Sequence, residues 1–216
     1  MISVEDQNSL FLVLSSRIKK DIECVALGGT AMMYKQYKAA TKDIDLVFKN
    51  DEDRDIFIKA IKGLGYEEKA IMGIYPSEKS KLKSVPLIYS RGEERFDLFV
   101  KKVFKTEVSN AMIKRAEEII DFSQEHRLRI KILADEDLIL LKSITSRKTD
   151  YDDIEFIFNN NKNIDWNIII DEAIQQAKKG DSFIILDLEE TMQKLKKSFF
   201  IKKEFFDKIY KDFEKI

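Results

Sequence analysis

The chain has 216 residues, one cysteine, and 38 basic against 39 acidic residues, which gives a formal net charge of -1. A single cysteine excludes an internal disulfide framework, and the balanced charge excludes a global field that attracts nucleic acid, although it allows a local basic patch. The apolar run at residues 10–14 lacks the flanks of a signal peptide, and no stretch reaches membrane-spanning length. We therefore expect a cytoplasmic protein without membrane contact.

The first third of the chain reads as alternating helices and strands. Apolar positions at helical spacing, followed by three basic residues, predict an amphipathic helix over residues 3–20. IECVAL (22–27) predicts a short strand that stops at two glycines, and TAMMYKQYK (30–38) predicts a helix. DIDLVF (43–48) predicts a second strand, and DEDRDIFIKAIKGLG (51–65) predicts a helix with an acidic start and a glycine end.

The middle of the chain changes to short apolar runs broken by turn residues. These runs predict three strands, over residues 66–75, 81–90 and 94–100. Pro86 cannot donate a ladder hydrogen bond and favours an edge position for its strand. Ser109 suits the N-cap of a short helix, and RLRIKILA (127–134) alternates like a half-exposed strand.

From Asp135 onward the chain reads as wholly helical, interrupted by the polar loop NNNKN at residues 159–163. We place a boundary near residue 134, with a mixed α/β part over residues 1–134 and a helical part over residues 135–216. No Pro/Gly/Ser-rich linker marks this boundary, so we expect the two parts to pack closely.

Three carboxylates and a glycine pair form the pattern that carries chemistry. Gly28 and Gly29 fall between a strand and a helix, where bare backbone N–H groups suit a phosphate. Asp43 and Asp45 point to the same side of one strand, and Asp97 lies in a similar apolar strand. Carboxylates and phosphate oxygens are the ligands that Mg²⁺ prefers, and three carboxylates can hold two metal ions for in-line phosphoryl or nucleotidyl transfer.

This pattern of GGT, a spacer, TKDIDL and the later RFDLF resembles the nucleotidyltransferase superfamily that includes DNA polymerase β. GGTA, the T-x-D-x-D strand and DEDLILLKSITSRKTDYDDI (135–154) are similar to the abortive-infection type IV toxin nucleotidyltransferases, over roughly residues 20–160. The resemblance implies an α/β (α+β) fold, in which a nucleotidyltransferase-like mixed β-sheet with flanking helices is followed by a C-terminal helical bundle.

The resemblance also implies roles for residues that match the family pattern. The glycine motif would hold the donor phosphates through Gly28, Gly29 and Thr30. Two Mg²⁺ ions would be bound by Asp43, Asp45 and Asp97, and Asp97 would help to deprotonate the acceptor hydroxyl. Lys142 would contact nucleotide phosphate, and an acid of the next helix, Asp150 or Asp153, would complete the pocket.

Each of these residues also has a purely structural interpretation. The strand acids would form a solvated edge, and Asp97 would pair with a neighbouring lysine. Lys142 would be a solvated lysine at the margin of a buried apolar stripe. Asp150 and Asp153, which share a helix face, would be first-turn acids favoured by the helix dipole. We interpret His126 as a surface residue and Cys24 as a small core residue.

The resemblance implies a metal-dependent enzyme that moves a nucleoside monophosphate from a nucleoside triphosphate (NTP) to a hydroxyl. The acceptor would be a tRNA 3′ end. The enzyme would be the toxin of a toxin–antitoxin or abortive-infection system, and an antitoxin protein would restrain it. Basic runs at residues 100–105, 127–131 and 194–203 would contact RNA, or form solvated faces. The alternatives are transfer to a small-molecule or protein hydroxyl, and a non-catalytic nucleotide-binding regulatory module.

Overall fold

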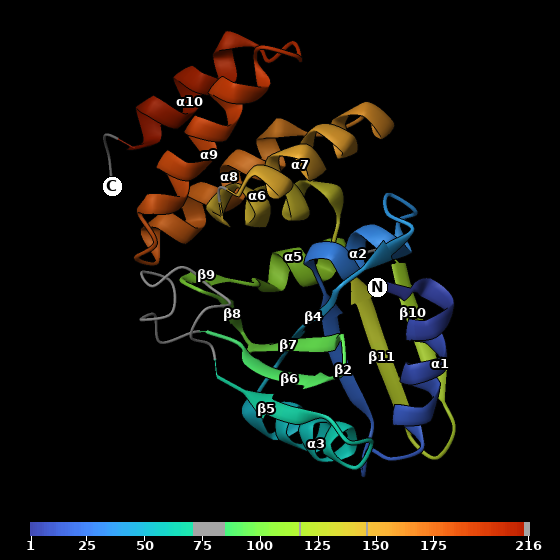
Figure 1. The fold of residues 1–216 in the computed structure, drawn as a ribbon. Helices are drawn as coiled ribbons and strands as arrows, with labels where there is room; N and C mark the ends of the chain where they lie inside the picture. Colours follow the sequence, from blue (N-terminus) through green and yellow to red (C-terminus); the bar gives the residue numbers. More distant parts are fainter. Residues whose placement is uncertain (71–84, 117, 146, 214–216) are drawn as a thin grey trace. The chain divides into compact units, whose positions relative to one another are not determined.

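The computed structural model describes residues 1–70, 85–116, 118–145 and 147–213 (Figure 1). The chain divides into two compact units, Met1–Leu133 and Ala134–Ile216, which have different architectures. Strands occur only in the first unit among the described residues, and the second is built from helices. No helix in these ranges is long and apolar enough to cross a membrane.

The first unit is a mixed β-sheet with helices against it. Its helices are α1 (Val4–Ser15), α2 (Gly28–Tyr34), α3 (Asp51–Lys62) and α5 (Asn110–Arg115). Its strands are β1 (Ile2–Ser3), β2 (Ile22–Ala26), β3 (Ala40–Thr41), β4 (Asp43–Phe48), β5 (Glu67–Lys69), β6 (Leu87–Arg91), β7 (Glu94–Val100), β8 (Lys102–Val103), β9 (Thr106–Glu107), β10 (Glu118–Ser123) and β11 (Arg127–Ile132).

The main sheet follows the strand order β10-β11-β2-β4-β7-β6-β5, and the short strands β8 and β9 extend from β7. The pairs β11–β2 and β4–β7 are parallel, and the other neighbours along this path are antiparallel. Strands β1 and β3 form a separate small pair. The predicted mixed sheet is therefore confirmed, and β2 and β4, which flank the glycine pair, lie at its centre.

Aromatic packing fastens α3 to the middle of the sheet. The Asn50 side chain accepts a hydrogen bond from the Asp53 backbone N–H at 2.8 Å, which caps the start of α3. The Phe57 ring then lies 5.2 Å from the Phe48 ring and 5.5 Å from the Phe96 ring, centroid to centroid, and all three side chains are buried. Edge-to-face and tilted aromatic pairs of this kind stabilise a core beyond the area that they bury.

Several local predictions were wrong. The first helix ends at Ser15 rather than continuing to residue 20, because the Ser15 and Ser16 hydroxyls donate to the carbonyls of Leu12 and Val13 and compete with the helix ladder. Pro86 does not make β6 an edge strand, since it precedes the first residue of β6, which pairs on both sides. Strand β10, which pairs with β11, was not predicted from the sequence.

The strands predicted over residues 66–75 and 81–90 fall partly outside the described residues. Their described parts form β5 and β6. The helix capped by Ser109 is confirmed as α5, because the Ser109 hydroxyl accepts from the Met112 backbone N–H at 3.1 Å.

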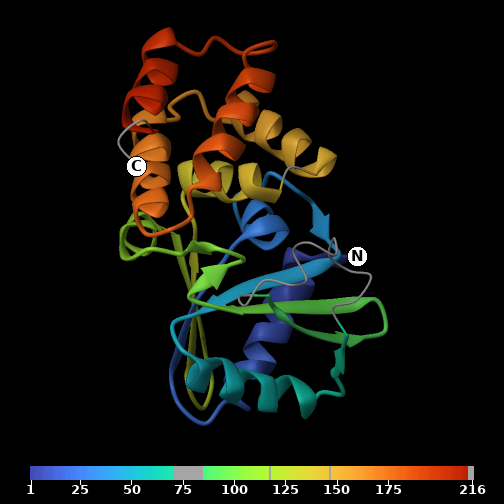
Figure 2. The same cartoon turned by 90° about the vertical axis from the view of Figure 1, so that its left-hand side faces the viewer.

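The second unit confirms the predicted helical character over its described residues. Figure 2 shows it as a group of helices without strands. These helices are α6 (Asp135–Thr145), α7 (Lys148–Asn160), α8 (Trp166–Lys178), α9 (Phe183–Leu195) and α10 (Lys203–Phe213). The Phe158 ring of α7 stacks on the Trp166 ring of α8, with 5.3 Å between centroids, so α7 and α8 are held across the predicted loop.

Candidate active site

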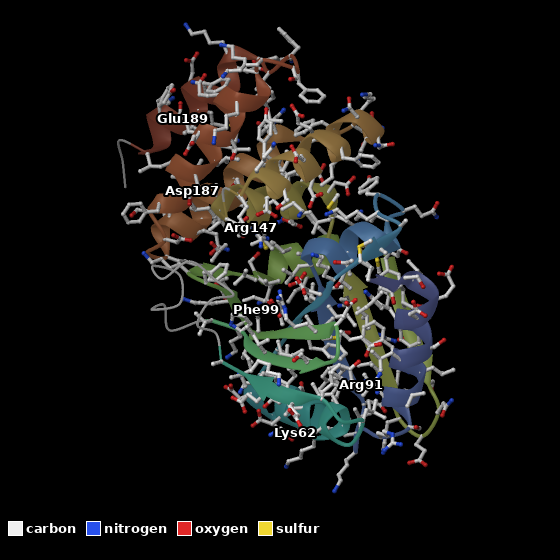
Figure 3. The ribbon with its side chains drawn as sticks, in the orientation of Figure 1. Lys62, Arg91, Phe99, Arg147, Asp187 and Glu189 are labelled. Carbon is white, nitrogen blue, oxygen red and sulfur yellow. The ribbon has the colours of Figure 1, made fainter. Side chains whose placement is uncertain are left out.

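Two parallel strands bring the three predicted carboxylates together. In the register of β4 and β7, Asp45 lies directly opposite Asp97, and Asp43 lies opposite Arg95. Residues two apart on a strand share a face, so all four side chains lie on one face of the sheet. Phe99 continues that face along β7 (Figure 3). The spacing of the motifs thus translates into a compact acidic site.

Arg95 is the residue of this site that the sequence analysis missed. Its Nη2 lies 2.6 Å from Asp43 Oδ2, and its Nε and Nη2 donate to the two Asp97 carboxylate oxygens at 2.8 and 3.2 Å. The Asp97 side chain is fully buried, and a buried carboxylate is costly unless it is paired and hydrogen-bonded. The signal in the sequence was an arginine two residues before Asp97, on the same strand face.

The glycine pair allows helix α2 to begin directly against β4. Gly28, the first residue of α2, has φ +56°, and a Cβ there would lie 2.4 Å from Asp45 Oδ2. A Cβ on Gly29 would lie 2.4 Å from Thr41 Oγ1. Both positions therefore exclude a side chain, and Gly28 also needs a left-handed backbone. The first backbone turn of α2 consequently stands beside the carboxylate of Asp45.

Thr30 is placed differently from the phosphate contact that the resemblance implied. Its side chain is fully buried, and its hydroxyl accepts from the Asp45 backbone N–H at 3.0 Å while donating to the Asp43 carbonyl at 3.5 Å. A hydroxyl held in this way fastens α2 to the strand that carries both aspartates. Its geometry favours positioning of the carboxylates over direct contact with a ligand.

The three aspartates are chemically suitable ligands for a hard divalent cation, but their present arrangement does not form a metal site. In the part of the chain that the structure describes, no three acidic, histidine or cysteine side chains are arranged so as to hold a metal ion. In the acidic site, the Arg95 guanidinium lies against carboxylate oxygens of Asp43 and Asp97 that a metal ion would use. Carboxylate oxygens suit Mg²⁺ or Mn²⁺. A cation shared by the three aspartates requires Arg95 to give up its contacts.

The residues predicted to complete the nucleotide pocket form a cluster of their own in the second unit. Lys142 Nζ lies 2.6 Å from Asp153 Oδ2 and 3.4 Å from Asp150 Oδ1, and all three side chains are buried. Thr145 and Arg147, the latter labelled in Figure 3, also donate to the Asp150 carboxylate, at 2.5 and 2.6 Å. This network ties α6 to α7.

The surroundings of Asp150 favour its ionised carboxylate. Burial raises the pKa of Asp150, but the hydrogen bond from Arg147 and the charge of Lys142 outweigh it, so the pKa of this carboxyl lies below its ordinary value. Lys142 is not the solvated lysine of the alternative interpretation, because only 7% of its side chain is exposed. Its nucleotide-binding role, and those of Asp150 and Asp153, stay predictions.

The other candidates have structural surroundings. Cys24 is buried in β2, which raises the pKa of its thiol. His126 is half-exposed, and its Nδ1 lies 3.8 Å from Asp21 Oδ1.

The basic run at residues 127–131 is paired with acids of neighbouring strands. Arg129 donates to Asp121 at 3.0 Å, and Lys131 Nζ lies 3.2 Å from Glu23 Oε1. Neighbouring strands therefore neutralise much of that run.

Comparison with known proteins supports the fold. No protein-family model matches the chain, and the search of curated proteins gives no match. The solution structure of the antibiotic-resistance factor ANT(2'')-Ia is similar over 86% of this chain and 97% of its own, with a TM-score of 0.50 and 12% sequence identity. A crystal structure of ANT(2'')-Ia in complex with adenylyl-2''-tobramycin covers 87% of this chain and 98% of its own, with a TM-score of 0.45 and 12% identity. The first similarity shows that the chain has a nucleotidyltransferase fold.

Proposed function

We propose that the chain is a metal-dependent nucleotidyltransferase that moves a nucleoside monophosphate from an NTP to a hydroxyl of a small molecule. The observation that carries this proposal is the juxtaposition of Asp43, Asp45 and Asp97 on β4 and β7, beside the glycine start of α2. Three carboxylates on one face of a sheet need positive charge beside them, which Arg95 supplies in this structure and a divalent cation would supply in the working enzyme. The nucleotidyltransferase fold gives this arrangement a chemical purpose.

Each residue has a role that follows from its position. Gly28 and Gly29, which carry no side chain of their own, would offer the backbone N–H groups at the start of α2 to the donor phosphates. Asp43, Asp45 and Asp97 hold the divalent cations, for which we propose two Mg²⁺ ions. When bound, these ions neutralise the charge of the donor phosphates and of the transferred group. Thr30 fixes both β4 aspartates through their backbone.

The reaction balances without a covalent intermediate on the protein. The acceptor oxygen forms a bond to the α-phosphorus, the bond between the α-phosphorus and the bridging oxygen breaks, and pyrophosphate leaves. The hydroxyl proton goes to a carboxylate, for which Asp97 is the candidate. The chain contributes orientation and electrostatics, which are the main sources of rate in phosphoryl transfer.

The acceptor class rests on two observations. ANT(2'')-Ia is an antibiotic-resistance factor, and adenylyl-2''-tobramycin, an adenylylated small molecule, is bound in one of its crystal structures. In this chain, Arg129 and Lys131 pair with acids of neighbouring strands, which weakens the argument for a polyanionic acceptor. The tRNA 3′ end, the antitoxin partner and the toxin kinship stay predictions from sequence resemblance.

Labelled-nucleotide transfer tests the proposal. The full chain is incubated with each α-³²P-labelled NTP and Mg²⁺, with either a filtered extract of small metabolites or total RNA as acceptor. Products are separated by thin-layer chromatography and denaturing gel. Asp45→Asn is the test variant, and Asp55→Asn is the matched control because Asp55 is an exposed acid on α3.

Each outcome assigns the site differently. Label in small products with the unmodified chain and Asp55→Asn, but not with Asp45→Asn, supports the proposal. Label confined to RNA shifts the acceptor to the predicted tRNA class. Mg²⁺-dependent NTP binding with no product in either mixture favours the non-catalytic regulatory module.

A further inference from the structure

The guanidinium of Arg95 touches the carboxylate oxygens that a metal ion would use. It contacts Asp43 Oδ2 at 2.6 Å and both carboxylate oxygens of Asp97 at 2.8 and 3.2 Å. We infer that Arg95 is an internal counter-ion that stands in for the divalent cation in the metal-free protein and is displaced when the cation binds. This inference rests on the proposed function, because it concerns the metal site of that function.

Burial explains why the metal-free protein needs such a counter-ion. The Asp97 side chain has no exposed surface, and it lies opposite Asp45 in the parallel register. A carboxylate removed from water beside another carboxylate is strongly unfavourable without a positive partner. Arg95 supplies one with a two-pronged contact, the geometry in which arginine binds carboxylates most firmly. It thereby stabilises the acidic site before any metal arrives.

Exposure explains how the counter-ion can leave. The Arg95 side chain is 26% exposed and that of Asp43 is 31% exposed, so the contact between them lies at the open side of the site. A long, flexible side chain at that position reaches water by rotating about its own bonds, without disturbing β7. Its backbone stays in the ladder with β4 and β6.

Competition for the same oxygens has a measurable consequence. A divalent cation and a guanidinium cannot both lie against Asp43 Oδ2 and the Asp97 carboxylate, because like charges at contact distance repel. The apparent metal affinity is then reduced by the fraction of molecules in which Arg95 has moved away. Arg95 is therefore a positioning residue that sets the threshold for metal loading.

The test measures metal binding in the absence of nucleotide. Mn²⁺ is the probe, because it prefers the same oxygen ligands as Mg²⁺ and its binding is followed by electron paramagnetic resonance. The variants are Arg95→Gln, which removes the charge, and Arg95→Lys, which keeps the charge but loses the two-pronged contact. Arg129→Gln is the control, since it removes an arginine from a carboxylate pair elsewhere on the sheet. Thermal unfolding with EDTA or with Mn²⁺ is recorded for each.

We expect Arg95→Gln to bind Mn²⁺ at least about tenfold more tightly than the unmodified chain, with Arg95→Lys in between and Arg129→Gln unchanged. Arg95→Gln should also unfold at a lower temperature in EDTA and gain more from Mn²⁺ than the unmodified chain. If Arg95→Gln folds only with Mn²⁺, that result supports the exchange directly.

Two failures are distinguishable. Equal or weaker Mn²⁺ binding by both Arg95 variants, with saturable binding by the unmodified chain, overturns the exchange and leaves the metal site intact. An unmodified chain that shows no saturable Mn²⁺ binding, with Asp43→Asn behaving identically, overturns the metal site of the proposed function itself.

Discussion

Two clusters in this chain each join a basic side chain to two aspartates, yet they are built differently. In the first unit, Arg95 bridges Asp43 and Asp97, and Asp45 adds a third carboxylate on the same face. In the second, Lys142 bridges Asp150 and Asp153, and Arg147 adds a second cation. The first cluster joins its arginine to two aspartates at a partly exposed edge, and the second joins its lysine to two aspartates that are buried.

The two clusters differ in exposure: the side chains of Arg95 and Asp43 are 26% and 31% exposed, whereas those of Lys142, Asp150 and Asp153 are nearly buried. Breaking a buried ion-pair network costs stability, because the groups that remain are left buried without their partner. An acidic cluster with an exposed edge is accessible to a cation from solvent. We therefore expect metal binding at the first cluster, and we expect the second to hold α6 against α7 whether or not it also contacts a nucleotide.

Asp45→Asn should give the largest effect. Removing one of three proposed metal ligands should cost about 4 kcal/mol of transition-state stabilisation, which is about a thousandfold in transfer rate. The free energy of unfolding without metal should change little, because asparagine has nearly the size and shape of aspartate and the side chain is not buried. Steady-state transfer and urea denaturation of the same preparations measure both quantities. A normal transfer rate in Asp45→Asn would contradict the proposed role of the carboxylates in transfer.

Lys142→Met tests the other half of the comparison. It leaves Asp150 and Asp153 buried without their shared cation, so we expect the free energy of unfolding to fall by about 3–5 kcal/mol. Adding Asp153→Asn should restore part of that loss, and Lys148→Met, at an exposed position of the same region, should be nearly neutral. Normal stability with lost nucleotide binding in Lys142→Met would instead support the predicted phosphate contact and break the comparison.

Gly28→Ala tests the close contact between the start of α2 and Asp45. Gly92 has a similar left-handed backbone, with φ +60° against +56°, but nothing within 4 Å of a Cβ, whereas a Cβ on Gly28 meets Asp45 Oδ2 at 2.4 Å. Gly92→Ala should cost about 1 kcal/mol for the backbone alone. Gly28→Ala should cost about 1–3 kcal/mol more and lower the transfer rate, because Asp45 must move. Equal costs in denaturation would show that α2 does not press against β4.

The sequence predicts the acidic site better than the contacts within it. Asp43, Asp45 and the glycine pair lie close together in the chain, and strand periodicity decides which way the two acids face. Asp97 joins them because β7 pairs in parallel with β4. The family pattern implied that Asp97 belongs to the metal site, but it did not give this pairing. Arg95 escaped prediction because an ion pair across two strands depends on their register.

In the second cluster, too, the sequence predicts local geometry but not the contacts that depend on packing. That Asp150 and Asp153 share a helix face follows from their spacing. That Lys142 lies between them depends on how α6 packs against α7, which no local pattern encodes. The ends of helices were also hard to place, since Ser15 and Ser16 stop α1 with hydroxyl contacts that compete with favourable helical spacing.

The smallest of these effects should be on the pH dependence of stability, where we expect the stabilising contribution of Asp150 to be lost at low pH. Arg147 and Lys142 hold the pKa of Asp150 below its ordinary value of 3.8 despite its burial. A depressed pKa in the folded state stabilises the protein above the unfolded pKa, and this contribution disappears as pH falls through the folded pKa. The stability gap between the unmodified chain and Asp150→Asn should therefore be constant above about pH 5 and shrink below about pH 4. Denaturation curves from pH 3 to 7 measure it, with Asp152→Asn, at an exposed acid of the same helix, as the control. A gap that stays constant to pH 3 would mean that the carboxylate charge contributes nothing, and that the second cluster is held by hydrogen bonds alone.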